Sequence, residues 1–266
     1  MEHYLTAESL YLKGSIFFGK NEYEQSLSCL ELALYTFKET GVTHLLKANA
    51  LYMIGCIQEK LGRCDQALIS LKEALAFHKK IGGLDHIDVA RTLRRLGTVH
   101  QARRECSQSL SCLKESLRIG IDQLGSRHLE VAQTYEYLSD TLSRELRYDE
   151  SVYYINEAIS IHESREHSLV LARCYALKGV LLDQIGGDLE VTISSYTQSK
   201  KIYSSILEQD RCTAETQSGY MSFASVVFKL AMVQERSGNL RAATSEYSRE
   251  FVPTPDAMLS IISSHY

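Results

Sequence analysis

Small and large apolar residues recur along the chain in one fixed order. Six small residues are spaced along the chain, and each is followed 16 or 17 positions later by a large apolar or aromatic residue. We call the stretch around each such pair a segment. The small residues are Gly14, Gly55, Gly97, Ser139, Gly179 and Ala231, and the large ones are Leu30, Leu71, Leu113, Ile155, Tyr196 and Tyr247. In the second segment, Ala67, Leu71 and Ala74 have the i, i+4, i+7 spacing of one helix face. The pattern therefore predicts amphipathic helices.

A strict internal period supports this prediction. The form G-x-x-H occurs three times, 42 residues apart, and an alanine follows each histidine after four residues. The three segments are Gly41 to His44, Gly83 to His86 and Gly125 to His128, followed by Ala48, Ala90 and Ala132. Because these histidines recur where a helix is expected to begin, we interpret them as capping or packing residues.

The recurring glycines predict close contact between two antiparallel helices in each repeat. A glycine inside a helix costs about 0.5–1 kcal/mol relative to alanine, and a close approach of two backbones compensates for that cost. The two prolines, Pro253 and Pro255, follow the last repeat, so none interrupts the helices before it. We expect an all-α fold over 1–252, with 253–266 as a tail or capping segment. The predicted repeats are approximately 7–40, 48–82, 90–124, 132–166, 172–208 and 224–252.

Two stretches resemble a known repeat family. The segment from His86 to Gly97, H-I-D-V-A-R-T-L-R-R-L-G, is similar to the H-P-x-V-A-x-T-L-x-x-L-G segment of kinesin light chain repeats. Leu61 to Ala67, continued by Glu73-Ala74-Leu75, resembles the G-x-Y-x-x-A and E-A-L parts of the same repeat. The chain is thus similar to the tetratricopeptide repeat family in its 42-residue form. The resemblance implies a right-handed superhelical solenoid of about six helix-turn-helix repeats, and a scaffold that binds proteins.

The resemblance also implies a peptide-binding groove lined by the first helix of each repeat. Carried over to this sequence, the family's groove positions include Tyr52, Met53, Arg91, Arg94, Arg95, Thr98, Gln101, Glu136, Tyr137 and Asp140. The spacing of the three arginines places their like charges on one helix face, which is unfavourable unless anions are near. The anions could be an acidic peptide held beside Tyr52, Met53 and Tyr137, an internal pair formed by Glu136 and Asp140, or solvent ions.

Charge and composition limit the classes of partner and function that we expect for the chain. The chain has 29 basic and 33 acidic residues and a net charge of −4, which argues against a general binder of nucleic acid. Its seven cysteines form no C-x-x-C pair, and we interpret them as reduced side chains of a cytoplasmic protein. We also expect no signal peptide and no membrane segment. His162 and His167 lack the spacing of a zinc site. We expect no enzymatic activity, no catalytic residues, no metal and no cofactor.

Two functions remain open from the sequence. The first is a scaffold that binds a peptide or protein segment, with an acidic motif, in the concave groove. The second is a structural protein that associates with itself through exposed ends, at the first repeat and at the apolar segment from Ala257 to Ile262.

Overall fold

The computed structural model describes residues 2–39, 45–164, 169–209 and 214–250, and within them the chain forms twelve α-helices and no strand. The all-α fold predicted from the sequence is therefore confirmed. The predicted tail, 253–266, and His44 and His167 lie outside the described residues. The helices are α1 (Glu2–Gly19), α2 (Tyr23–Glu39), α3 (Leu45–Lys60), α4 (Cys64–Gly82), α5 (Ile87–Ala102), α6 (Cys106–Leu124), α7 (Leu129–Arg144), α8 (Tyr148–His162), α9 (Leu169–Ile185), α10 (Leu189–Gln209), α11 (Ala214–Arg236) and α12 (Leu240–Glu250).

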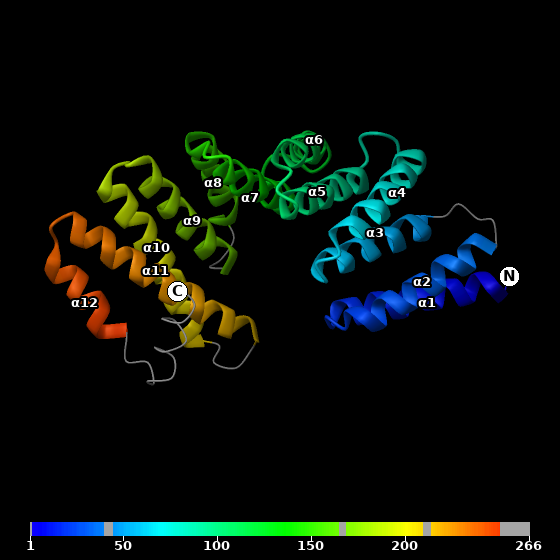
Figure 1. Cartoon of the computed structure of the whole chain (residues 1–266), viewed down its shortest axis with the longest axis horizontal. Coiled ribbons are helices and arrows are strands. Elements are labelled where there is room, and N and C mark those ends of the chain that lie inside the picture. The colour runs from blue at the N-terminus through cyan, green and yellow to red at the C-terminus, as the bar shows by residue number, and fades with distance from the viewer. Residues whose placement is uncertain (1, 40–44, 165–168, 210–213, 251–266) are drawn as a thin grey trace. The chain divides into compact units, whose positions relative to one another are not determined.

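The helices form two compact units, Met1–Leu146 and Arg147–Tyr266, which we call unit 1 and unit 2. In unit 1 each helix from α1 to α7 packs against the next one, and the alternate helices α1, α3, α5 and α7 also contact one another in turn (Figure 1). In unit 2, α8 to α12 pack in the same successive order, and α9 contacts α11. The boundary between the units falls between α7 and α8, which belong to one predicted repeat.

The recurring glycines lie where the two helices of a pair are closest. A Cβ atom added to Gly55 would lie 2.5 Å from Cγ of Leu71, and one added to Gly97 would lie 2.7 Å from Cγ of Leu113. Gly179 in unit 2 has the same relation to the ring of Tyr196. The large residue of the second helix thus occupies the space that a side chain on the first helix would need, as the sequence pattern predicts.

Buried serines add hydrogen bonds between the paired helices. The hydroxyl groups of Ser26, Ser116 and Ser199 donate to the backbone oxygens of Gly14, Ala90 and Ala172, each at 2.7 Å. These serines are at most 2% exposed. The small residues of the repeat therefore allow close packing and, where they are serine, also satisfy their own buried hydroxyl group.

The turn between the first and second helix has the same backbone form in all six pairs. Its left-handed residue is glycine three times, at Gly62, Gly186 and Gly238, and a non-glycine residue three times, at Asn21, Arg104 and Leu146. After Gly62 and Arg104, the next N–H donates to a carbonyl five residues earlier, which is the Schellman form of helix ending.

Among the described residues, none of the helices has a stretch that is long and apolar enough to cross a membrane.

Candidate functional site

All ten predicted groove residues lie in unit 1, on α3, α5 and α7. We call this set the first-helix face. Seven of the ten are partly exposed, whereas Arg94, Thr98 and Gln101 are only 7–9% exposed. The Thr98 hydroxyl donates to the backbone oxygen of Arg95, within α5.

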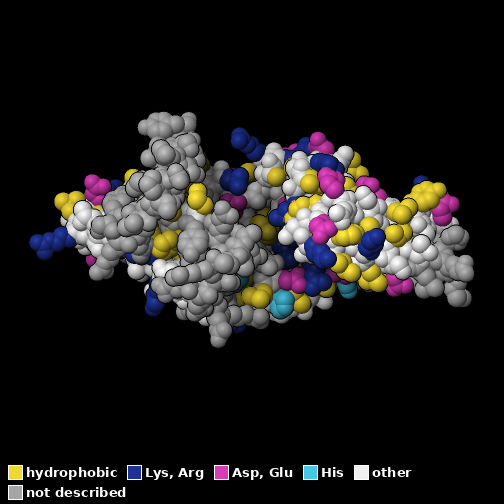
Figure 2. All heavy atoms as spheres, turned by 90° about the horizontal axis from the view of Figure 1, so that it is seen from below, with side chains coloured by type: hydrophobic (Ala, Val, Ile, Leu, Met, Phe, Trp, Pro, Cys, Tyr) yellow, Lys and Arg dark blue, Asp and Glu magenta, His cyan; other side chains and the backbone are white. Residues whose placement is uncertain are grey.

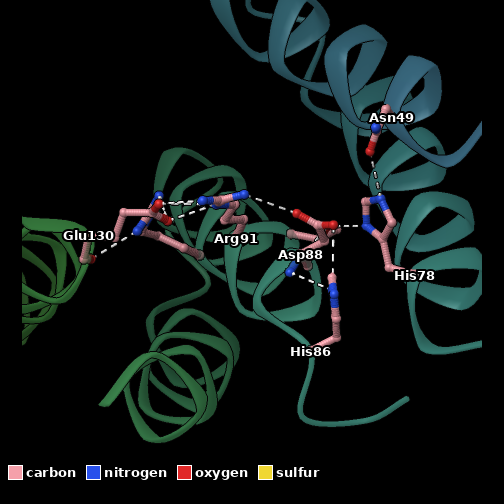
Figure 3. Close-up of polar contacts among 8 residues, drawn as sticks. Asn49, His78, His86, Asp88, Arg91 and Glu130 are labelled. Carbon is pink, nitrogen blue, oxygen red and sulfur yellow. Dashed lines mark hydrogen bonds and ion pairs between the residues drawn. The ribbon is translucent and has the colours of Figure 1, made fainter. Parts of the chain in front are cut away.

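Arg91 lies between two carboxylates (Figure 3). On one side its Nε lies 2.9 Å from Oε2 of Glu130, and its Nη2 lies 2.6 Å from Oε1 of the same residue. On the other side its Nη1 donates to Oδ1 of Asp88 at 3.1 Å. The contact with Glu130 has the bidentate geometry of strong guanidinium–carboxylate pairs, and it joins α5 to the start of α7.

Arg94 reaches the same residue of α7. Its Nη1 donates to the backbone oxygen of Glu130 at 2.9 Å, and its Nη2 lies 3.5 Å from Oε2 of the Glu130 carboxylate. The hydrogen bond from Arg91 lowers the pKa of Glu130, with the charges of Arg91 and Arg94 acting in the same direction and burial opposing them. Glu130 is therefore the carboxylate that neutralises two of the three arginines.

One alternative left open by the sequence was that Glu136 and Asp140 neutralise the three arginines. The structure pairs the arginines with other carboxylates. The carboxylates that the structure places against the arginines are those of Glu130, Asp88 and Glu59. Asp140 instead accepts a hydrogen bond from Gln101 and pairs with Arg144 on its own helix.

Arg95 is held more loosely than its two neighbours. Its Nη1 lies 3.8 Å from Oε2 of Glu59 on α3, which is an ion pair but too long for a hydrogen bond. The Nε of Arg95 and the Oε2 of Glu59 are both buried and have no hydrogen-bond partner among the described residues. The side chain of Arg95 is 30% exposed. Burial raises the pKa of the adjacent Tyr52, whereas the charge of Arg95 and a side-chain hydrogen bond between Arg95 and Tyr52 oppose that rise.

A polar network continues from Arg91 toward the second repeat. His78 on α4 is 3% exposed, and its two ring nitrogens lie 2.9 Å from Oγ1 of Thr92 and 3.2 Å from Oδ1 of Asn49. The Thr92 hydroxyl in turn lies 2.7 Å from the backbone oxygen of Asp88. Burial lowers the pKa of His78, the charge of Asp88 opposes this, and His86 adds to it. The network joins α3, α4 and α5.

The recurring histidines cap the first helices. Nδ1 of His86 accepts from the backbone N–H of Asp88 at 3.3 Å, and Nδ1 of His128 accepts from that of Glu130 at 3.2 Å. Both histidines stand at the N-cap position with extended backbone angles. Their capping role, predicted from the repeat, is confirmed for these two.

Tyr52 and Met53 are half-buried rather than standing free on the face. Met53 packs against the core cluster that contains Leu30 and Ile54, and Tyr52 packs against the cluster that contains Leu71. On the side of unit 1 seen in Figure 2, basic and acidic side chains are interspersed with apolar ones. This side of unit 1 therefore presents side chains of both charges (Figure 2).

Comparison with known proteins places these features in a family. A family model described as tetratricopeptide repeat matches residues 5–80 and 88–164, more than half of the chain. The chain belongs to the tetratricopeptide repeat family. A comparison of this tetratricopeptide repeat chain with curated proteins gave no match.

Several solved structures are similar to this tetratricopeptide repeat chain. BtubC (BKLC) from P. vanneervenii is 16% identical, with a TM-score of 0.68 over 77% of this chain and 82% of that one. A putative kinesin light chain from Podosopora anserina, with nearly identical repeats, is 15% identical, with a TM-score of 0.63 over 80% and 100% of the two chains. The apo form of RapI is 14% identical, with a TM-score of 0.68 over 93% and 95%. At these identities the likeness shows the fold alone.

Two of the carboxylates that pair with the arginines could have been found from the repeat in the sequence. Asp88 and Glu130 are 42 residues apart, and each follows a repeated histidine by two positions. Both are therefore first-turn acidic residues of first helices in the tetratricopeptide repeat, where a carboxylate is favoured.

Proposed function

We propose that the chain binds a segment of another protein on the first-helix face, and that Arg95 pairs with a carboxylate of that segment. The fold supports this, because tetratricopeptide repeats stack into extended surfaces suited to binding. The observation that carries the proposal is the contrast among the three arginines. Arg91 and Arg94 are hydrogen-bonded to Glu130, whereas the carboxylate paired with Arg95, that of Glu59, is 3.8 Å away, and the side-chain hydrogen bond of Arg95 is with Tyr52.

The unpartnered atoms favour exchange of Glu59 for a ligand. A buried polar atom without a hydrogen bond costs about 1–3 kcal/mol. A partner that supplies a carboxylate to Arg95 and a backbone N–H to Glu59 would remove that cost at both atoms. Displacing Glu130 from Arg91 would instead break hydrogen bonds of 2.6–3.1 Å. Recognition of an acidic segment therefore centres on Arg95.

A capture experiment with matched charge reversals tests the proposal. Tagged full-length chain is compared with Arg95→Glu and with Arg118→Glu, an exposed arginine on α6 that has its own acidic neighbours. The captured proteins are quantified by mass spectrometry. We expect Arg95→Glu to lose a set of partners that Arg118→Glu retains. Equal capture by the two variants would rule out recognition through Arg95.

Self-association through the first repeat is a second candidate. Leu12 and Ile16 lie one turn apart on α1 and are 54% and 59% exposed. The other predicted end, Ala257 to Ile262, lies outside the described residues. Light scattering across the micromolar range separates this candidate from the first, since a mass that stays at one chain, 30.1 kDa, at every concentration excludes it.

A further inference from the structure

Two large apolar side chains are exposed where α4 ends. Ile81, in the last turn of the helix, is 45% exposed, and Leu84, in the connection to α5, is 67% exposed. The same turn of α4 carries two exposed lysines, Lys79 and Lys80. We call residues 79–84 the α4 tip. It combines apolar surface with positive charge.

The backbone of the α4 tip is fixed by two glycines. Gly83 has φ of 87°, and its N–H donates to the backbone oxygen of Lys79 at 3.0 Å, which closes the end of the helix. A Cβ atom added to Gly82 would lie 2.5 Å from Cγ of His86, so the N-cap residue of α5 packs directly against the end of α4. His86 thus occupies the inner side of the turn, and Leu84 is left exposed.

The turn after α6 has the same backbone form but polar side chains. Its glycine, Gly125, has φ of 85°, and the N–H donates to the backbone oxygen of Ile121 at 2.9 Å. The residues of this turn that stand 42 positions after Lys80, Ile81 and Leu84 are Asp122, Gln123 and Ser126, all exposed. The fold therefore accepts polar residues at these positions and does not require apolar ones.

The acidic residues near the α4 tip are paired with an arginine. Asp85 and Glu115 both form ion pairs with Arg118 of α6. The pKa of Glu115 is lowered chiefly by its hydrogen bond from Arg118, and the charge of Lys79 adds to this. Lys80 forms no ion pair within the described part of the chain. Positive charge therefore remains at the α4 tip.

Apolar side chains beside cations are complementary to the surface of an anionic lipid bilayer. We propose that the chain binds the surface of an anionic membrane through the α4 tip. Ile81 and Leu84 enter the boundary between headgroups and acyl chains, where apolar surface is buried. Lys79 and Lys80 face the headgroups, where the negative surface potential attracts cations.

The small size of the α4 tip favours a bilayer over a protein partner. A specific protein interface buries about 800 Å² on each side and needs matching shapes. Two side chains at the end of one helix cover only part of such an area. A bilayer surface accepts an apolar side chain without a preformed pocket, so the α4 tip suffices for it.

Membrane binding at the α4 tip is separate from the function proposed for the first-helix face. The tip belongs to α4 and to the turn after it, whereas the first-helix face lies on α3, α5 and α7. Binding through the α4 tip therefore does not depend on Arg95.

The absence of tryptophan from the chain allows a single fluorescent reporter to be placed at the α4 tip. Leu84→Trp is compared with Ile69→Trp, at a position of α4 that is 69% exposed and lies outside the tip. The probes are phosphatidylcholine vesicles with and without phosphatidylserine. We expect vesicles with phosphatidylserine to shift the emission of the Leu84→Trp chain to shorter wavelength. The emission of the Ile69→Trp chain should not change.

Substitutions taken from the turn after α6 test the side chains of the α4 tip. Ile81→Gln combined with Leu84→Ser should weaken vesicle binding by about tenfold in co-sedimentation. Lys80→Asp should also weaken it by about tenfold, because it reverses one charge at the surface. Ile69→Gln and Lys72→Asp make the same types of change at exposed positions of α4 outside the tip and should leave binding unchanged.

Four results would overturn the proposal: no binding to vesicles with phosphatidylserine, equal binding to both kinds of vesicle, no shift with Leu84→Trp, or equal weakening by the tip variants and their controls. If Leu84→Trp lowers the helix content measured by circular dichroism, the co-sedimentation series decides the outcome. Arg95→Glu should bind vesicles as the original chain does. Loss of vesicle binding by Arg95→Glu alone would place the membrane contact on the first-helix face and reject the α4 tip.

Discussion

At Gly97 the absence of a side chain sets how closely α5 and α6 approach. Alanine has the higher helix propensity by about 1 kcal/mol. A Cβ at this position, however, would lie 2.7 Å from Leu113 Cγ, and overpacking of this kind costs about 1–3 kcal/mol. We therefore expect Gly97→Ala to lower the melting temperature. Gly19→Ala is the control, since a Cβ there meets nothing within 4 Å. A Gly97→Ala chain as stable as the original would contradict the close contact.

The left-handed residue of the turn after α5 is Arg104, with φ of 63°. A non-glycine residue in this region costs roughly 1–2 kcal/mol. Arg104 is exposed, so its side chain contributes little that glycine would lose. We expect Arg104→Gly to raise the free energy of unfolding by about 1 kcal/mol, measured by urea denaturation. The reciprocal change is Gly62→Ala, where φ is 73° and an added Cβ meets nothing within 4 Å. It should lower the free energy of unfolding, and an increase would contradict the argument.

Single-residue features were predictable from the sequence where the residue type was itself unusual. A glycine inside a helix indicates a close contact, and a repeated histidine indicates a cap. The left-handed backbone at Arg104 and Leu146 gives no such signal, because the chain places ordinary side chains in a conformation that glycine adopts more easily. The hydroxyl bonds of Ser26 and Ser116 were also not predictable, since a small residue suffices for packing alone.

Between neighbouring elements, Glu130 is the main polar link from α7 to α5. Its pKa is lowered in the folded chain, chiefly by the hydrogen bond from Arg91. The ionised carboxylate therefore stabilises the fold above the ordinary pKa of about 4.3, and this contribution is lost as pH falls through the lowered folded pKa. We expect Glu130→Gln to reduce the melting temperature at pH 7, and the difference from the original chain to shrink below pH 4. A constant difference from pH 7 to pH 3 would contradict this role.

His78 links three elements, α3, α4 and α5, and its pKa is lowered chiefly by burial. The unfolded chain therefore takes up a proton at this residue near pH 6.5, before the folded chain does. Stability should fall as pH drops from about 6.5 toward 5. We expect His78→Gln, whose amide does not titrate, to show a smaller loss over this interval in thermal melts. An identical loss in both chains would exclude His78 as the source.

Helix pairing was predictable from the 42-residue period, but the pairing of charges between helices was not. The sequence placed Arg91, Arg94 and Arg95 on one face, and one of the three alternatives that it left open paired them with Glu136 and Asp140 of the next first helix. Side chains on a helix lean toward its N-terminus, so the arginines of α5 meet the first turn of α7 at Glu130. Spacing within a helix does not reveal this offset between helices.

At the scale of the whole molecule, unit 1 presents two different surfaces to its surroundings. The first-helix face carries charged side chains that are largely paired internally, with Arg95 the looser one. The α4 tip carries exposed apolar side chains beside lysines. The family and fold were predictable because the small residues recur with a fixed period. The exposure of Ile81 and Leu84 was not, because it depends on how the turn after α4 packs against His86 at the start of α5.

Site-specific photocrosslinking tests the central claim, that a partner binds on the first-helix face. A photoreactive phenylalanine derivative replaces Tyr137 on α7 or, as the control, Tyr35 on α2, which is 64% exposed on a second helix of the same unit. Binding on the first-helix face predicts protein adducts from position 137 that disappear with Arg95→Glu, and few from position 35. Adducts of equal yield from both positions, or adducts from position 137 that persist with Arg95→Glu, would contradict it.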